Sequence, residues 1–144
     1  MTLQLAPLQP QHLEDAAALV SQRYRALCAE TPALPDHFAQ PDVILAKLAA
    51  LTAAAPGVAA LRGGKLVGFL AAYLLPSFRG RRGVYCPEWA NGARLDDAFA
   101  IYQELYRGIA GDWVRNGYFL HGLTIFANDR PGLDAWHWQG FGMI

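Results

Sequence analysis

Arginines and glycines form the first group of residues that could hold a ligand. Arg79-Gly80-Arg81-Arg82-Gly83 combines positive charge with a flexible backbone, and both properties favour phosphate binding. A phosphate cradle needs a helix directly after its glycines, but a predicted strand at 84–89 follows here. We interpret the segment as a solvated hairpin loop, with contact to an anion or a nucleic acid as the alternative. Three arginines without interleaved aromatic residues are a weak signal for nucleic acid.

The histidines and cysteines show no pattern typical of metal binding or nucleophilic catalysis. Neither His121 nor His137 stands at a metal-ligand spacing from another histidine, cysteine or acidic residue, so no metal is expected. No Gly-x-Ser-x-Gly or other nucleophile signature occurs. Cys86 lies on a predicted strand, where a cysteine is most often a small core residue. Together with Cys28 it predicts reduced thiols rather than a disulfide framework.

The apolar pattern along the chain predicts the helices and strands that position these residues. Leu13, Ala17 and Val20 recur at helical spacing, and the residues on both sides of Gly63-Gly64 indicate a β-hairpin. This order predicts a mixed α/β sheet with helices on its faces. The predicted elements are a short first strand from residue 3, helices at 11–29 and 42–55, strands at 58–61, 65–75 and 84–89, a loop at 76–82, a helix at 96–116, a strand at 120–126 and a helix at 133–139.

Length and composition limit the class of protein. The 144 residues correspond to one domain. Twelve basic and 12 acidic residues give a net charge of zero, which argues against a generic binder of nucleic acid or of anionic membranes. The longest apolar stretch, 66–76, is too short to span a membrane, and without a signal-peptide pattern we expect a cytoplasmic protein. A hydrophobic fraction of 53% predicts a surface covered by another chain or domain.

Two segments of the chain resemble the GNAT family (Gcn5-related N-acetyltransferases). The first is the hairpin 61–70, which looks like that family's second and third strands, with Gly68 set in the third. The resemblance covers nearly the whole chain. It implies an α/β fold of the GNAT-like (acyl-CoA N-acyltransferase) class, with a mixed central sheet flanked by helices. The second segment looks like the family's fifth strand, fourth helix and closing Gly-Phe, and its matching residues are Leu123-Thr124-Ile125, Asn128-Asp129, Trp136 and Gly140-Phe141.

The resemblance implies an acetyl-CoA-dependent N-acetyltransferase that acts by direct attack of a primary amine on the thioester. The acceptor would be an amine of a small molecule or a peptide. In that family the CoA pyrophosphate is held by backbone amides of a glycine-rich loop at a helix N-terminus. Donors on a splayed strand engage the pantetheine arm and the thioester. A proton donor, often a tyrosine, protonates the leaving thiolate.

The segment matched to the pyrophosphate loop departs from the family pattern Arg/Gln-x-x-Gly-x-Gly/Ala. Pro87-Glu88-Trp89 fits the lead-in, but Ala90 stands at the Arg/Gln position, and Ala93 and Leu95 stand at the two glycine positions. Asp96-Asp97 would occupy the first helical turn, which favours a self-capped helix without phosphate. If a cofactor binds, the resemblance assigns it to Cys86, Trp89, Ala90, Asn91, Gly92, Ala93 and Asn128.

Few residues are candidates for catalysis. Glu88 lies where some family members have a general base, and Tyr85 could donate a proton to a thiolate if it lines a cleft. The alternatives are an exposed loop carboxylate and a buried structural tyrosine. Trp136 occupies the position of the family's tyrosine. Its indole N–H donates hydrogen bonds but is not an acid near neutral pH, so general-acid catalysis is not expected there.

The chain stops where the family has two further strands. We therefore predict a single GNAT-like domain, residues 1–144, that is truncated at its C-terminal end and lacks the last strands. A second GNAT domain or a partner chain would complete the sheet, and a homo-oligomer is the expected assembly. The sequence resembles the N-terminal half of proteins with two GNAT domains in tandem, where one half can keep the fold and lose CoA binding. The alternative function is therefore a catalytically silent domain that packs against and supports an active partner domain.

Overall fold

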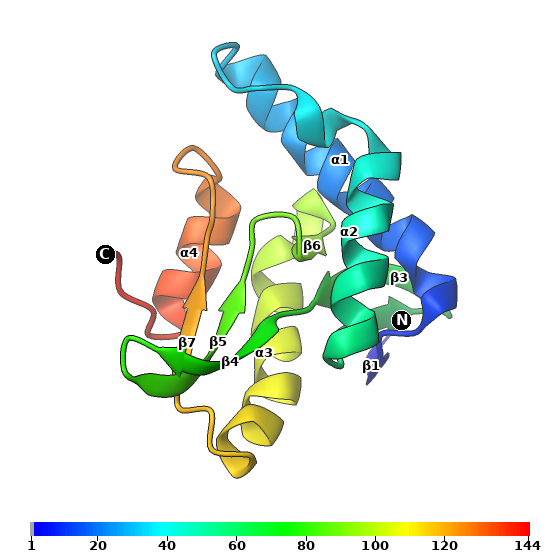
Figure 1. Ribbon diagram of the computed structural model, residues 1–144. Helices are drawn as coiled ribbons and strands as arrows, with labels where there is room; N and C mark the ends of the chain where they lie inside the picture. The colour runs from blue at the N-terminus through cyan, green and yellow to red at the C-terminus, as the bar shows by residue number, and fades with distance from the viewer. Residues whose placement is uncertain (1) are drawn as a thin grey trace.

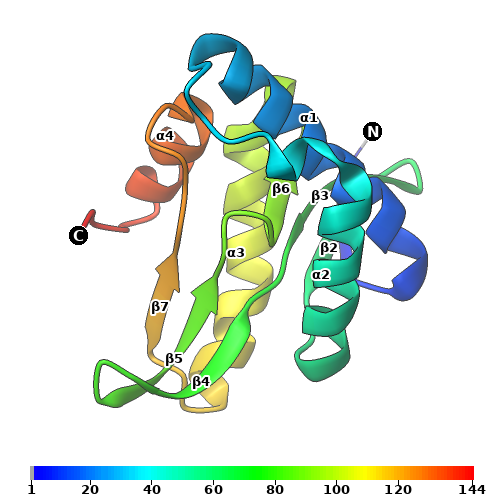
Figure 2. The same ribbon diagram turned by 45° about the horizontal axis from the view of Figure 1, so that its top comes forward.

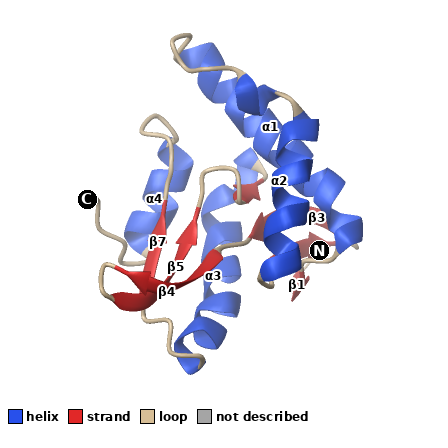
Figure 3. Ribbon diagram, in the orientation of Figure 1, coloured by secondary structure: helices blue, strands red, loops and turns tan. Residues whose placement is uncertain are grey.

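A computed structural model describes residues 2–144 as an α/β protein (Figure 1), with helices and strands distinguished by colour in Figure 3. The α/β class predicted from the sequence is confirmed. The α-helices are α1 (Leu13–Glu30), α2 (Pro41–Ala54), α3 (Ala98–Arg115) and α4 (Arg130–Trp138). The strands are β1 (Leu3–Pro7), β2 (Val58–Arg62), β3 (Lys65–Leu70), β4 (Tyr73–Phe78), β5 (Arg81–Cys86), β6 (Asn91–Ala93) and β7 (Leu120–Leu123).

The strands form two small sheets instead of the single sheet that the sequence suggested. One sheet has the order β1-β2-β3-β6 and is antiparallel throughout. The other has the order β4-β5-β7, in which β5 and β7 are parallel. The predicted hairpin is present as β2 and β3, and its turn residues Gly63 and Gly64 adopt φ values of 61° and 78°, which glycine reaches without steric cost.

The two sheets arise because both long strands predicted in the middle of the chain are interrupted. The predicted strand 65–75 breaks at Ala71-Ala72 and continues as β4 to Phe78, so the expected loop 76–82 shrinks to a turn at Arg79-Gly80. The predicted strand 84–89 ends at Cys86, because the next residue, Pro87, has no N–H to donate to a ladder. The chain turns there and returns as β6, which pairs with β3.

The four helices begin one to three residues away from their predicted starts. The predicted start of α3 at residue 96 is wrong, because a 3₁₀ turn at Leu95–Asp97 precedes the helix, which begins at Ala98. The fourth helix begins at Arg130 and not at residue 133. Asp129 is its N-cap, and its carboxylate accepts a hydrogen bond from the Gly132 N–H at 3.2 Å, which satisfies one of the free donors at the helix start.

Helices cover both faces of the first sheet (Figure 2). A Cβ placed on Gly68 of β3 would collide with Ile101 of α3, whereas one placed on Gly92 of β6 would lie 3.6 Å from Val20 of α1. Because Gly68 and Phe69 are neighbours on one strand and Gly92 pairs with Phe69, these contacts lie on opposite faces. The core between the layers is apolar, and no helix of residues 2–144 has the length and apolar character needed to cross a membrane.

Candidate functional site

The site that the sequence suggests for a cofactor lies where β5 and β7 part. The two strands are paired from Gly83↔Leu120 to Cys86↔Leu123, and the Thr124 N–H donates to the Cys86 carbonyl at 3.0 Å. The next strand along the chain, β6, pairs with β3 and not with β7. The space between β6 and the segment leading into α4 is therefore not bridged by backbone hydrogen bonds. In the family that the sequence resembles, donors on a splayed strand engage the pantetheine arm.

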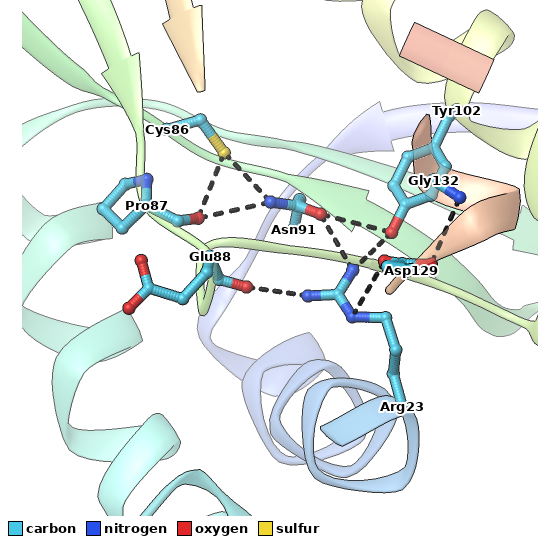
Figure 4. Close-up of polar contacts among 8 residues, drawn as sticks. All are labelled: Arg23, Cys86, Pro87, Glu88, Asn91, Tyr102, Asp129 and Gly132. Atoms are coloured by element: carbon cyan, nitrogen blue, oxygen red, sulfur yellow. Dashed lines mark hydrogen bonds and ion pairs between the residues drawn. The ribbon is translucent and has the colours of Figure 1, made fainter. Parts of the chain in front are cut away.

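The side chain of Arg23, from α1, fills this space (Figure 4). Its Nη1 donates to Asn91 Oδ1 at 2.9 Å and to the Tyr102 hydroxyl at 2.6 Å. Its Nη2 donates to the Glu88 carbonyl at 2.7 Å. The residue is only 4% exposed, although arginine is rarely buried without a partner. Arg23 thus joins α1 to the turn before β6, to β6 itself and to α3.

Asp129 places a carboxylate beside the buried guanidinium. Asp129 Oδ2 lies 3.8 Å from Arg23 Nε, and Asp129 is 3% exposed. Among residues 2–144, neither of these two atoms has a hydrogen-bond partner, whereas Asp129 Oδ1 accepts from the Gly132 N–H. A buried ion pair stabilises a fold little overall, but the loss of one partner leaves an uncompensated buried charge. The pair therefore makes removal or displacement of Arg23 costly.

Cys86 and Asn91 complete the cluster. Asn91 Nδ2 donates to Cys86 Sγ at 3.4 Å and to the Pro87 carbonyl at 3.2 Å, and the Tyr102 hydroxyl donates to Asn91 Oδ1 at 3.2 Å. Burial raises the pKa of Cys86 and of Tyr102 to about 12 in each case. At neutral pH both side chains are therefore protonated, and Cys86 is not the thiolate that nucleophilic chemistry requires.

The segment matched to the pyrophosphate loop runs from Ala90 to Leu95; Ala90 to Ala93 are buried, whereas Arg94 and Leu95 are exposed. Ala90, Asn91 and Ala93 are 3% exposed or less, and Gly92 is also buried. The Ala90 N–H donates to the Pro87 carbonyl at 3.0 Å, and the Arg94 N–H donates to the Val67 carbonyl at 2.9 Å. In an anion site several backbone N–H groups converge on open space. Here Asn91 to Ala93 pair with β3, and Leu95 begins the 3₁₀ turn before α3.

The start of α3 carries two carboxylates that are engaged in ion pairs. Asp97 lies 2.8 Å from Arg62, and Asp96 lies 3.1 Å from Arg94. All four side chains are at least about one-third exposed, so each pair stabilises the fold by less than about 1 kcal/mol. Both nearby arginines are occupied by carboxylates at the helix end that a pyrophosphate would need.

No protein-family model and no curated protein matches this sequence. Solved structures do resemble it. A ribosomal-protein-alanine N-acetyltransferase from Brucella melitensis biovar Abortus 2308 is 19% identical, with a TM-score of 0.72 over 99% of this chain and 94% of that chain. An aminoglycoside acetyltransferase from an uncultured soil metagenomic sample is 19% identical, with a TM-score of 0.68 over 100% and 94%. An aminoglycoside N-acetyltransferase in complex with CoA is 15% identical, with a TM-score of 0.64 over 99% and 89%.

The chain has the GNAT fold. At these identities the likeness shows the fold alone, and the residues of the site decide what the fold can bind. Three contacts of the site bear on whether it can hold the CoA that one of these structures contains. Arg23 occupies the space between the parted strands, the amides at Ala90 and Arg94 are bonded within the protein, and Asn91 is held in the buried cluster.

The predicted catalytic residues lie near this cluster without joining each other. The Tyr85 hydroxyl shares a 2.6 Å hydrogen bond with Thr124 Oγ1. Glu88 contributes its carbonyl to Arg23, while its carboxylate points away from the guanidinium in Figure 4. Trp136, at the tyrosine position of the GNAT family, is 3% exposed and packs 5.4 Å from the Tyr102 ring. Roles for Tyr85 and Glu88 in catalysis stay predictions.

The two remaining predicted cofactor residues contact other parts of the GNAT fold. Trp89 is buried beside Tyr73, and Lys47 Nζ lies 5.5 Å from its ring centroid. Asn128 Nδ2 donates to Thr31 Oγ1 at 3.0 Å and to the Leu27 carbonyl at 3.3 Å. Asn128 therefore ties the segment before α4 to the end of α1, and its assignment to a cofactor likewise stays a prediction.

Arg23 and Tyr102 were missed as site residues by reasoning from the sequence. A signal for Arg23 was present, because it falls on the buried stripe of α1 that includes Val20, Tyr24 and Leu27. A charged residue at helical spacing within an apolar stripe needs a buried partner. Its partners lie 68 and 79 residues further along the chain, and no local pattern identifies them.

Proposed function

We propose that this chain is a catalytically silent GNAT-fold domain that packs against and supports an active acetyltransferase domain. The observation that carries the proposal is the Arg23 side chain between β6 and the start of α4. Its guanidinium donates to Asn91, Tyr102 and the Glu88 carbonyl and lies beside Asp129. A pantetheine arm could enter only after these contacts were broken.

The energetic argument rests on the buried charges. If Arg23 moved out, the buried carboxylate of Asp129 would lose the cation beside it, and breaking such a pair costs roughly 3–5 kcal/mol. That cost would be subtracted from the binding free energy of any cofactor. The carboxylates of Asp96 and Asp97 at the start of α3 provide no compensating attraction for a pyrophosphate.

An apolar surface supports the partner half of the proposal. Phe99 of α3 and Trp138 of α4 are 40% and 73% exposed, and their ring centroids lie 6.2 Å apart. Large aromatic side chains are enriched at protein–protein interfaces. The partner proposed here is a second GNAT domain or a second copy of this chain, whose surface would cover these two rings.

The second candidate function is acetyl-CoA-dependent N-acetyl transfer by this chain itself, to a primary amine of a small molecule or peptide. It is supported by the fold likeness to N-acetyltransferases, one of them in complex with CoA. In this candidate Glu88 or Tyr85 would exchange protons with the reacting groups. The α1 helix would first have to withdraw Arg23.

Binding of acetyl-CoA separates the two candidates. Saturation at about 100 times the Kd would stabilise the fold by about 2.7 kcal/mol, a melting shift on the order of 10 °C for a chain of this length. We expect no shift and no calorimetric heat at millimolar acetyl-CoA, with a CoA-binding acetyltransferase as the positive control. A saturable shift would contradict the silent assignment and favour the second candidate.

On the same sample, light scattering is expected to show self-association, and a monomer at high concentration would count against the interface.

A further inference from the structure

A second gap between the sheets lies at the opposite end of α3 from the Arg23 cluster. It is a cavity of about 620 Å³, bounded by β1, the start of β2, β4, β5 and the C-terminal half of α3. We call it the inter-sheet cavity. Its volume lies within the range of about 300–1,000 Å³ that is typical of small-molecule sites. Neither the predicted cofactor residues nor the Arg23 cluster contributes to it.

The cavity follows from the strand interruption at Ala71-Ala72. Strand β2 pairs with β3 only as far as Val58↔Leu70, and β1 pairs with β2 only as far as Pro7↔Val58. From Tyr73 onward the chain pairs with β5 instead. The first sheet therefore ends where the second begins, and in Figure 2 β4 runs away from β3 in front of α3.

Most of the wall is apolar. Leu5 of β1, Leu74 of β4 and Ile109 and Trp113 of α3 line the inter-sheet cavity. Leu5 is 39% exposed. Ile109 and Trp113 are buried at 6% and 7% exposure and form the floor of the cavity. Such a surface suits an aliphatic or aromatic body.

The wall of this cavity carries one arginine and one aspartate. Arg82 of β5 lines it, and its guanidinium carbon lies 4.3 Å from the centroid of the Tyr118 ring. Among residues 2–144, Arg82 is in none of the ion pairs. The acidic residue of the wall, Asp112, is already paired with Arg115. A guanidinium stacked on an aromatic ring and without a carboxylate partner favours an anionic group.

We propose that the inter-sheet cavity binds a small organic monocarboxylate with an apolar body. The body lies against Leu5, Leu74 and Trp113, and the carboxylate accepts hydrogen bonds from Arg82. The proposal goes beyond the silent-domain function and does not depend on it, because no residue of the Arg23 cluster takes part. A cation of the same shape is disfavoured by Arg82, and a neutral alcohol lacks the charge-assisted hydrogen bond.

The test uses octanoate as the probe and the indole N–H resonances of the ¹⁵N-labelled protein as the readout. The chain has four tryptophans, of which Trp113 lines the cavity, and its resonance is assigned with Trp113→Phe. Titration with octanoate is expected to shift the Trp113 indole signal saturably and to leave those of Trp89 and Trp136 in place. Octylamine is expected to produce no saturable shift.

Two arginine variants test the role of charge. Arg82→Gln should weaken octanoate binding about tenfold, as expected for the loss of one charge-assisted hydrogen bond, while binding of octanol stays unchanged. Arg81→Gln is the matched control, because neighbouring residues of a strand point to opposite faces. Both arginines are exposed, so both variants should fold. The proposal is overturned if Trp113 does not shift at millimolar octanoate, if all four indoles shift alike, or if the two variants weaken binding equally.

Discussion

The two ends of α3 face two gaps in the β-structure, and the gaps are filled in opposite ways. Near Tyr102, in the N-terminal half of the helix, the gap beside β6 is closed by Arg23 and its hydrogen-bonded partners. Near Trp113, in the C-terminal half, the gap between the sheets stays open as a cavity of about 620 Å³. A parting of strands therefore creates a site only where no neighbouring element fills it.

The difference comes from one helix. α1 contacts β6 and β3, and the side chain of its Arg23 lies in the first gap. Because that side chain is buried, it must be matched by polar atoms from β6, α3 and the N-cap of α4. The second gap is bounded mostly by apolar side chains, and its charged residues, Arg82 and Asp112, are exposed to solvent and need no such matching. We expect the closed end to respond strongly to substitution and the open end to tolerate it.

The largest effect is expected from Arg23→Ala. It leaves Asp129 buried without a cation and removes three hydrogen bonds, so the free energy of unfolding should fall by about 3–5 kcal/mol. Urea denaturation measures this change. Arg107→Ala is the control, since Arg107 is exposed on α3 and paired with Glu104, and it should cost less than about 1 kcal/mol. Equal losses in the two variants would show that Arg23 does not hold the closed end together.

An alkaline loss of stability is expected from the same end. Burial raises the pKa of Cys86 from 9.0, and that of Tyr102 from 10.0, to about 12. Between pH 9 and 12 the unfolded chain releases protons that the folded chain keeps, so the unfolded state binds fewer protons and stability falls as pH rises. Each group contributes a slope of up to about 1.4 kcal/mol per pH unit.

Unfolding measured at several pH values checks this prediction. The stabilisation from burial of the protonated groups is fully present below pH 9 for Cys86 and below pH 10 for Tyr102. It is lost as the pH rises from these values towards about 12. Cys86→Ala should flatten the slope between pH 9 and 10, and Cys28→Ala is the matched control from α1. A slope that is the same in Cys86→Ala and in the parent protein would mean that Cys86 is not buried as described.

A pair of glycine substitutions gives the smallest and most direct contrast. In Gly68→Ala the new Cβ collides with Ile101, which is fully buried, and lies 3.2 Å from the Gly92 carbonyl, so a loss of about 1–3 kcal/mol is expected. In Gly108→Ala the new Cβ lies 2.5 Å from Leu5 Cδ1, but Leu5 can swing into the cavity. Alanine also raises helix propensity by about 1 kcal/mol, so the net change should stay within about 1 kcal/mol of zero.

Thermal or urea unfolding of both variants decides the comparison. A loss at Gly108 as large as that at Gly68 would mean that the region around Leu5 is as tightly packed as the core. The inter-sheet cavity would then have no room for the leucine to move, and no room for a ligand body.

The fold was largely predictable because its elements leave local patterns. The helices at 13–30 and 98–115 follow from apolar spacing, and the β2–β3 hairpin follows from Gly63-Gly64 between two apolar stretches. The boundaries were less predictable. Pro87 interrupts one long strand and Ala71-Ala72 the other, and whether a chain bends at such points depends on which strand is available for pairing.

By itself the sequence determined the α/β order, the mismatch at the pyrophosphate loop and the tryptophan at the tyrosine position. These are properties of residue type and spacing, and they need no knowledge of distant contacts. Only the tertiary structure decided that Arg23 closes the first gap and that the second stays open. The physical reason is that periodicity shows which face of α1 is buried, whereas the partners of the buried charge lie 65 to 106 residues further along the chain.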